Sequence, residues 1–104
     1  MDTTRLETLR KVLEAEPNDS FTRYAIGLEY ISLNMPEEAK DTLEELRTMD
    51  PNYAATYYQL GKVYEQLGDE SAARKIYEKG LYVATSQGDM HTKDELQAAI
   101  DELL

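Results

Sequence analysis

Apolar residues recur along the chain at helical spacing, in blocks that short polar, proline or glycine segments separate. In the last block the apolar residues stand at i, i+3, i+4, i+7 and i+8: Leu96, Ala99, Ile100, Leu103 and Leu104. This spacing places them on one face of a helix. Taken together, the blocks predict helices over about 5–14, 20–33, 37–49, 53–67 and 70–84, and a last helix within 90–104.

A period of 34 residues relates the two middle pairs of predicted helices. It links matched residues in both pairs: Gly27 and Gly61 (61 − 27 = 34), Tyr30 and Tyr64, Ala39 and Ala73, and Pro17 and Pro51. Self-similarity at this period, with helical patterning in each half, is typical of stacked helix–turn–helix repeats. The chain is therefore predicted to contain two consecutive repeat units.

The second unit carries the fuller motif. It reads Tyr57-x2-Leu60-Gly61-x2-Tyr64, followed by Ala73-x3-Tyr77. With Tyr in place of the leading Trp, this resembles the tetratricopeptide (TPR) repeat, whose pattern is W-x2-L-G-x2-Y and then A-x3-F. The first unit matches in part, with Ile26-Gly27-x2-Tyr30 and Ala39-x3-Leu43, but Arg23 stands where an aromatic residue is expected.

The resemblance implies an all-α fold, a right-handed α-α superhelix of about six antiparallel helices in one domain. Its expected parts are a leading helix over 5–16, repeat one over 20–53, repeat two over 54–87 and a closing helix over 90–104. The closing helix has one apolar face, as a terminal cover for a repeat stack needs. Small residues stand where paired helices are expected to cross closely: Gly27, Gly61 and Gly80.

Two sequence signals predict where the outer helices begin. Thr4-x-x-Glu7 and Thr92-x-x-Glu95 both have the form of a capping box. In that motif the Thr and Glu side chains each satisfy a free backbone N–H of the first turn. We therefore expect the first helix to be capped by Thr4 and the last by Thr92.

Composition narrows the range of partners. The chain has 104 residues, with 11 Lys and Arg against 21 Asp and Glu, which gives a formal net charge of −10. This balance repels nucleic-acid backbones and anionic membranes, so we expect neither nucleic acid nor a membrane as a partner. No apolar run approaches the ~20 residues that span a bilayer, and residues 1–4 do not look like a secretory signal. We expect a cytoplasmic protein.

The residue types give no sign of an active site, so we expect that the protein is not an enzyme. There is one His and no Cys, and no nucleophile motif or phosphate-binding glycine loop. Asp89, His91, Asp94 and Glu95 stand together, but at a helix start, where the helix dipole favours acidic residues. No metal and no cofactor is therefore expected. The acidic residues of the third helix are expected to form a solvated face: Glu37, Glu38, Asp41, Glu44 and Glu45.

The first helices of the two units differ at three matched positions. In each case the first unit is apolar where the second is small or charged: Phe21 against Ala55, Leu28 against Lys62, and Ile31 against Glu65. With Tyr24, the three apolar residues fall at i, i+3, i+7 and i+10, which makes a continuous stripe along one helix. We call Phe21, Tyr24, Leu28 and Ile31 the apolar stripe.

The family resemblance implies that this stripe lines a concave groove. The groove residues are then the apolar stripe together with Tyr58, Lys62 and Glu65 of the second unit. We therefore predict a non-catalytic interaction module that binds a peptide or helix segment of a protein partner. Two alternatives stay open: the first or last helix of the chain covers the stripe, or the stripe pairs with a second copy in a homodimer. Tyr24 and Leu28 stand where chaperone-tail-binding relatives carry Lys and Asn, which disfavours that ligand.

Overall fold

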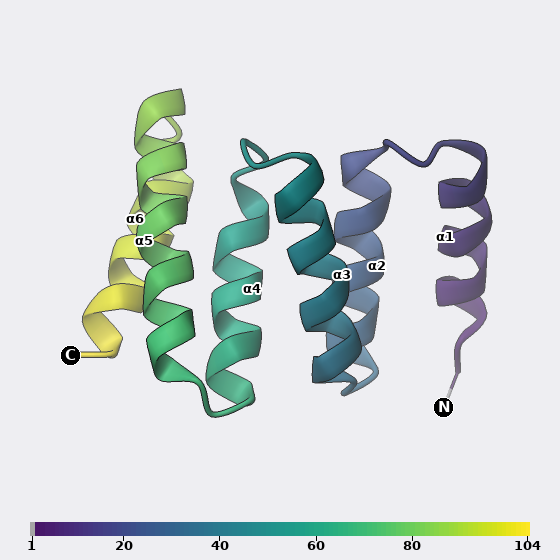
Figure 1. The fold of residues 1–104 in the computed structure, drawn as a ribbon, viewed down its shortest axis with the longest axis horizontal. Coiled ribbons are helices and arrows are strands. Elements are labelled where there is room, and N and C mark those ends of the chain that lie inside the picture. The colour runs from purple at the N-terminus through teal and green to yellow at the C-terminus, as the bar shows by residue number, and fades with distance from the viewer. Residues whose placement is uncertain (1) are drawn as a thin grey trace.

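The computed structural model describes residues 2–104, which fold into six α-helices (Figure 1). They are α1 (Thr4–Ala15), α2 (Ser20–Ser32), α3 (Pro36–Met49), α4 (Ala55–Gln66), α5 (Glu70–Gln87) and α6 (Met90–Glu102). The helices run up and down in turn and form a stack, from α1 at one end to α5 and α6 at the other. The all-α helical repeat fold predicted from the sequence is confirmed.

The stack has two layers. Helices α2 and α3 pack as one antiparallel pair and α4 and α5 as a second, while α6 packs against α5 and α4. Contacts between α2 and α4, and between α4 and α6, join these three helices into one layer. Helices α3 and α5 lie in front of this layer in Figure 1, and α1 packs against α2 at the end of the stack.

The core lies between the two layers. Its fully buried large side chains are Leu43, Leu46, Leu60, Val63, Tyr77 and Leu96. Burying an aliphatic or aromatic side chain of this size contributes ~1.5–3 kcal/mol, so these residues dominate the stability of the stack. The Tyr77 hydroxyl donates a hydrogen bond to Glu65 of α4, which satisfies the polar end of an otherwise buried ring.

Two glycines allow α4 and α5 to approach closely, as the sequence predicted. A Cβ atom at Gly61 would lie 2.6 Å from Cζ of Tyr77, and one at Gly80 would lie 2.9 Å from Cγ of Tyr57. Both distances are far shorter than carbon–carbon contact, so no larger residue fits without movement. Glycine at these positions thus makes room for the two buried tyrosine rings.

The capping box predicted at Thr4 and Glu7 is wrong. Thr4 is already helical, and Thr3 before it makes no side-chain hydrogen bond to the backbone of the first turn. The Thr4 N–H donates instead to Oδ1 of Asp2 over 3.0 Å. Because Asp2 takes the backbone donor that the capping box would assign to Glu7, α1 begins one residue earlier than predicted.

The capping box predicted to begin at Thr92 is also wrong, because Asp89 caps α6. The Asp89 carboxylate accepts a hydrogen bond of 3.1 Å from the Thr92 N–H, so Thr92 lies inside the first turn. Helix α5 runs to Gln87, past the predicted end at Ala84, and closes at Gly88 with a φ of 69°. No residue between Ala84 and Gly88 lacks an N–H or favours a left-handed backbone, so nothing ends the helix sooner.

Candidate functional site

The apolar stripe on α2 is partly exposed and partly packed. Phe21 is 68% exposed and Leu28 is 36% exposed. Tyr24 and Ile31 are half-buried and pack against the core. The centroid of the Tyr24 ring lies 5.7 Å from that of Tyr53. Phe21 and Leu28 are therefore the members of the stripe most open to a partner.

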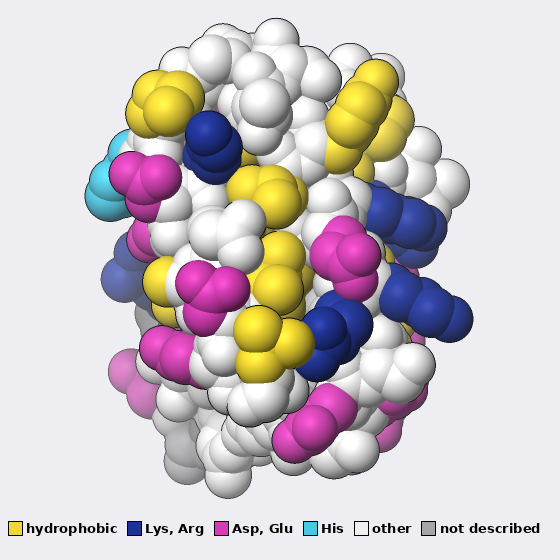
Figure 2. Space-filling model, turned by 90° about the vertical axis from the view of Figure 1, so that its left-hand side faces the viewer, with side chains coloured by type: hydrophobic (Ala, Val, Ile, Leu, Met, Phe, Trp, Pro, Cys, Tyr) yellow, Lys and Arg dark blue, Asp and Glu magenta, His cyan; other side chains and the backbone are white. Residues whose placement is uncertain are grey.

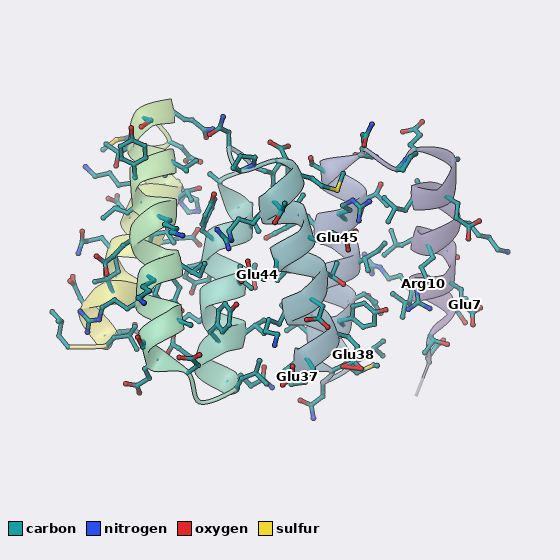
Figure 3. The ribbon with its side chains drawn as sticks, in the orientation of Figure 1. Glu7, Arg10, Glu37, Glu38, Glu44 and Glu45 are labelled. Carbon is teal, nitrogen blue, oxygen red and sulfur yellow. The ribbon has the colours of Figure 1, made fainter. Side chains whose placement is uncertain are left out.

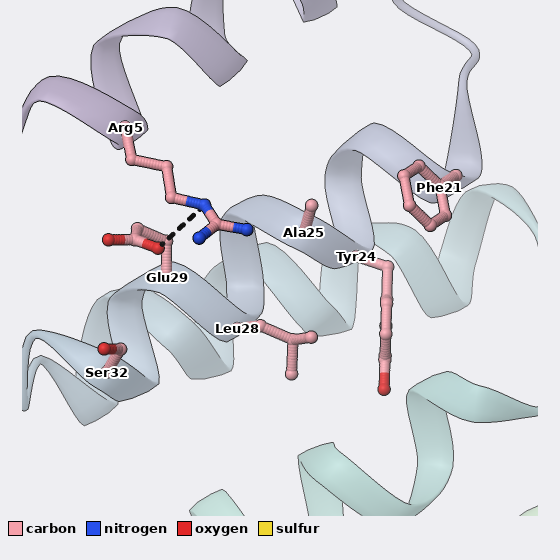
Figure 4. A pocket seen from close by; sticks show the side chains of 7 residues that line it. All are labelled: Arg5, Phe21, Tyr24, Ala25, Leu28, Glu29 and Ser32. Carbon is pink, nitrogen blue, oxygen red and sulfur yellow. Dashed lines mark ion pairs between the residues drawn. The ribbon is translucent and has the colours of Figure 1, made fainter.

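A hollow of about 340 Å³ lies beside these two exposed residues (Figure 4). Its lining comes from α2, with one residue from α1: Phe21, Tyr24, Ala25, Leu28, Glu29, Ser32 and Arg5. Arg5 Nε lies 3.6 Å from Oε2 of Glu29, and this ion pair closes one side of the hollow. The hollow therefore combines an apolar wall with one neutralised pair of charges.

Neither end helix covers Phe21 and Leu28. Helix α1 packs against α2 but contributes only Arg5 to the lining of the hollow. Helix α6 packs against α5 and α4, and within residues 2–104 it makes no backbone-level contact with α2. The alternative in which the chain covers its own stripe therefore does not hold for these two residues.

The groove residues of the second unit are engaged within the chain. Lys62 Nζ lies 3.8 Å from Glu65 and 3.7 Å from Glu102 of α6, and 5.5 Å from the centroid of the Tyr58 ring. Glu65 also accepts a hydrogen bond from the Tyr77 hydroxyl. The structure thus brings Tyr58, Lys62 and Glu65 together, where they tie α4 to its neighbours α5 and α6.

Tyr24 connects the two sets of groove residues. The pKa of its hydroxyl is raised, mainly by burial. A hydrogen bond with the Gln59 side chain opposes this shift, and Tyr53 and the Glu95 carboxylate add to it. Gln59 belongs to α4 and Glu95 to α6, so the hydroxyl lies beside α4 and within electrostatic reach of α6. Figure 4 shows the ring pointing away from Arg5 and α1. Tyr24 therefore lines the hollow beside α2 and also borders the face that these three helices share.

Several residues of this face were not identified from the sequence. Ala25, Glu29 and Ser32 follow Phe21 at i+4, i+8 and i+11, so helical spacing could have found them. Arg5 and Glu102 carry no such signal. Their side chains reach the face only because α1 and α6 pack at the two ends of the stack.

The acidic residues outside this face have structural or solvated positions. Figure 3 labels Glu44 and Glu45 on α3. Glu44 pairs with Arg47 over 2.7 Å, and Glu45 pairs with Arg23 over 3.0 Å. Hydrogen bonds from Thr92 lower the pKa of the Asp89 carboxyl, in keeping with its role as a helix cap. Among residues 2–104, no three His, Cys, Asp or Glu side chains gather as metal ligands would. No helix in the same range is long and apolar enough to cross a membrane.

A second apolar surface lies at the opposite end of the stack, on α5 and α6. Figure 2 looks at this end and shows apolar side chains running between charged ones. The most exposed large apolar residues of α5, α6 and the chain end after them are Tyr82 at 76%, Met90 at 56% and Leu104 at 86%. These residues do not line the hollow beside α2. They provide matched controls for the exposed residues of α2.

Comparison with known proteins identifies relatives along most of the chain. A family model for the tetratricopeptide repeat matches residues 30–100. A TPR repeat-containing protein of Pseudomonas aeruginosa is 30% identical over 98 residues, which cover 94% of this chain and 93% of that protein. The crystal structure of a tetratricopeptide repeat domain protein from Salinibacter ruber is 39% identical, with a TM-score of 0.79, and the match covers 82% of this chain and 94% of that one.

One further structure is similar in fold at low sequence identity. PcrH, crystallised in complex with the chaperone binding region of PopD, has a TM-score of 0.88 and is 17% identical. The match covers 94% of this chain and 74% of that one. At this identity the comparison concerns the arrangement of the helices alone.

Proposed function

The chain belongs to the tetratricopeptide repeat family, whose fold generally mediates protein–protein interactions without catalysis, and we propose that it binds a segment of a partner protein. The segment, a peptide or a helix, lies on the face that α2, α4 and α6 share. The residues proposed to contact or border it are Phe21, Tyr24, Leu28, Ile31, Tyr58, Lys62 and Glu65.

The exposure of Phe21 and Leu28 beside the hollow carries this proposal. Phe21 leaves 68% of its surface in water, although covering a side chain of this size is worth ~1.5–3 kcal/mol. The hollow of about 340 Å³ next to it can receive a large side chain of a partner. Aromatic residues fixed on a helix lose little conformational freedom on binding, which is why they often anchor interfaces.

The similarity to PcrH supports the proposal only at the level of the fold. PcrH was crystallised with the chaperone binding region of PopD, so helices arranged in this way can hold a segment of another protein. The residues that would select a segment must be argued from this chain alone. Here the open apolar residues lie on α2, and the residues of α4 are engaged with α5 and α6.

Self-association is the second candidate function. The same exposed pair, Phe21 and Leu28, could face its counterpart in a second copy, because a two-fold interface places one patch against itself. A homodimer of this kind would have a mass near twice 11.9 kDa that persists on dilution. Light scattering at several concentrations separates it from a monomer that binds another protein.

The test is affinity capture from the native cell extract with the wild-type chain and the Phe21→Ser/Leu28→Ser variant. We expect a protein that the wild type retains and the variant loses. Tyr82→Ser is the matched control, since Tyr82 is similarly exposed but lies on α5, far from the hollow. Circular dichroism should show that all three chains keep the same helical content.

Three other results would contradict the proposal. If both the wild type and the Phe21→Ser/Leu28→Ser variant retain the same proteins, the stripe is not the binding surface. If Tyr82→Ser abolishes capture as well, binding depends on the opposite end of the stack. If the wild type retains only its own chain, the homodimer is the better description.

A further inference from the structure

Two carboxylates of α6 border the face on which we place the partner. Glu102 Oε2 lies 3.7 Å from Lys62 Nζ of α4, and the Glu95 carboxylate is close enough to Tyr24 of α2 to influence its hydroxyl. They stand seven residues apart, two helical turns, and therefore on the same side of α6. The side chain of Glu95 is 43% exposed and that of Glu102 is 71% exposed. Both are accessible to a bound segment.

The cations on this face are already matched by carboxylates. Lys62 lies within 4 Å of both Glu65 and Glu102, and Arg5 pairs with Glu29. In the part of the chain that the structure describes, the only basic group within ion-pair distance of Glu95 is His91, which is charged only when protonated. These residues amount to four carboxylates and two permanent cations: Glu29, Glu65, Glu95 and Glu102 against Arg5 and Lys62. The chain as a whole has a formal net charge of −10.

We propose that the bound segment is basic and amphipathic: an apolar side chain fills the hollow beside Phe21 and Leu28, and a Lys or Arg pairs with Glu95 or Glu102. This inference rests on the proposed function. The apolar wall lies on α2 and the acidic wall on α6, so the two ends of the face select different side chains. An acidic segment would be repelled by α6 and by the chain as a whole.

The arrangement of the helices sets the spacing between these two side chains. Helices α2, α4 and α6 are successive members of one layer. Neighbouring axes lie about 8–10 Å apart, so α2 and α6 are separated by roughly 16–20 Å. An extended chain advances about 3.3 Å per residue. A segment that crosses the face in extended form therefore needs its basic residue about five or six positions from its apolar anchor.

The sequence preference can be measured even though the natural partner is unidentified. A phage-displayed library of random peptides, long enough to cross all three helices, is selected on the wild-type chain at low ionic strength. Soluble Phe21→Ser/Leu28→Ser protein is added in excess to remove peptides that bind elsewhere. We expect enriched peptides to carry a Lys or Arg about five or six residues from a large apolar residue.

A selected peptide is then synthesised and its affinity is measured by fluorescence anisotropy. Glu95→Gln/Glu102→Gln should weaken binding roughly 2- to 30-fold, which is the range for two partly exposed charge pairs. Glu38→Gln/Asp41→Asn removes the same charge from exposed positions on α3 and should leave the affinity unchanged. Added salt should weaken binding to the wild type more than to the Glu95→Gln/Glu102→Gln variant.

The failure of this inference differs from the failure of the proposed function. If the enriched peptides are neutral or acidic, or their affinity does not depend on Glu95 and Glu102, the basic segment is refuted while a groove at Phe21 and Leu28 stands. If no peptide prefers the wild type over the Phe21→Ser/Leu28→Ser variant, both proposals are refuted.

Discussion

Replacing Gly61 with Ala should destabilise the fold although Ala is the better helix former. The new Cβ would lie 2.5 Å from Cδ1 and 2.6 Å from Cζ of Tyr77, and closer still to Cε1. The Tyr77 ring is fully buried, lies 6.4 Å from the Tyr58 ring between centroids, and is anchored through its hydroxyl to Glu65. It therefore cannot swing out of the way, and α4 and α5 must separate instead.

Two opposing effects set the size of the loss. Overpacking a filled core costs about 1–3 kcal/mol, and the overlap with three ring atoms places this site at the upper end. Ala gains about 1 kcal/mol over Gly in the interior of a helix. The difference is a net loss of about 2 kcal/mol in the free energy of unfolding. For a domain of this size that lowers Tm by roughly 8–16 °C.

Thermal and urea unfolding followed by circular dichroism would measure the effect. Gly27→Ala is the control, because Gly27 holds the same place in the first repeat but faces Leu43, whose Cδ2 would lie 2.6 Å from the new Cβ. Leu43 can change rotamer more readily than a buried ring, so we expect a smaller loss. Adding Tyr77→Leu to Gly61→Ala should recover part of the stability. An unchanged or higher Tm for Gly61→Ala alone would refute the close crossing of α4 and α5.

Three further predictions concern the turns and the tyrosines. Asn34 and Gly68 hold matched positions after α2 and α4, with φ of 57° and 83°. By thermal unfolding, Gly68→Ala should therefore cost about 1 kcal/mol, and Asn34→Gly should be nearly neutral. Asp19→Ala removes the acceptor of the Phe21 N–H and should lower the free energy of unfolding in urea by about 1 kcal/mol. Burial and the Glu44 carboxylate raise the pKa of Tyr64 from 10.0 to about 12. The stabilisation that the neutral Tyr64 hydroxyl gives the folded state should thus be complete below pH 10 and decline as the pH rises towards 12. Tyr64→Phe should flatten that part of a plot of unfolding free energy against pH.

The repeated core could be predicted from the sequence because its residues are fixed by the period. Gly61 must be small where Tyr77 is large, and the 34-residue spacing shows the same relation between Gly27 and Leu43. Such pairs depend on helix crossings that recur in every unit. Helical spacing therefore locates both the apolar blocks and the close crossings from the sequence alone.

The ends of the helices were harder to predict because several residues compete for the same backbone groups. Asp2 takes the Thr4 N–H, and Asp89 takes the Thr92 N–H, so each capping box loses to a nearby acidic residue. The acidic wall of the groove was missed for another reason. Glu95 and Glu102 belong to a helix outside the 34-residue period, and their place opposite α2 follows only from how α6 packs on the stack.

The difference between the two repeats has a physical explanation in the neighbours of their first helices. Lys62 and Glu65 on α4 face α6 and pair with its side chains or with those of α5, so charged residues are stabilised there. On α2, which contacts α4 in the same layer, the counterparts are apolar: Ile31 packs against the core, and Leu28 is 36% exposed beside the hollow. Phe21 leaves 68% of its surface exposed and contributes little to folding, so Phe21→Ser should leave Tm nearly unchanged, whereas Leu28, at 36% exposed, buries more of its surface and Leu28→Ser should lower Tm modestly. Stability and partner binding therefore depend on different residues of the same fold, and the two can be tested separately.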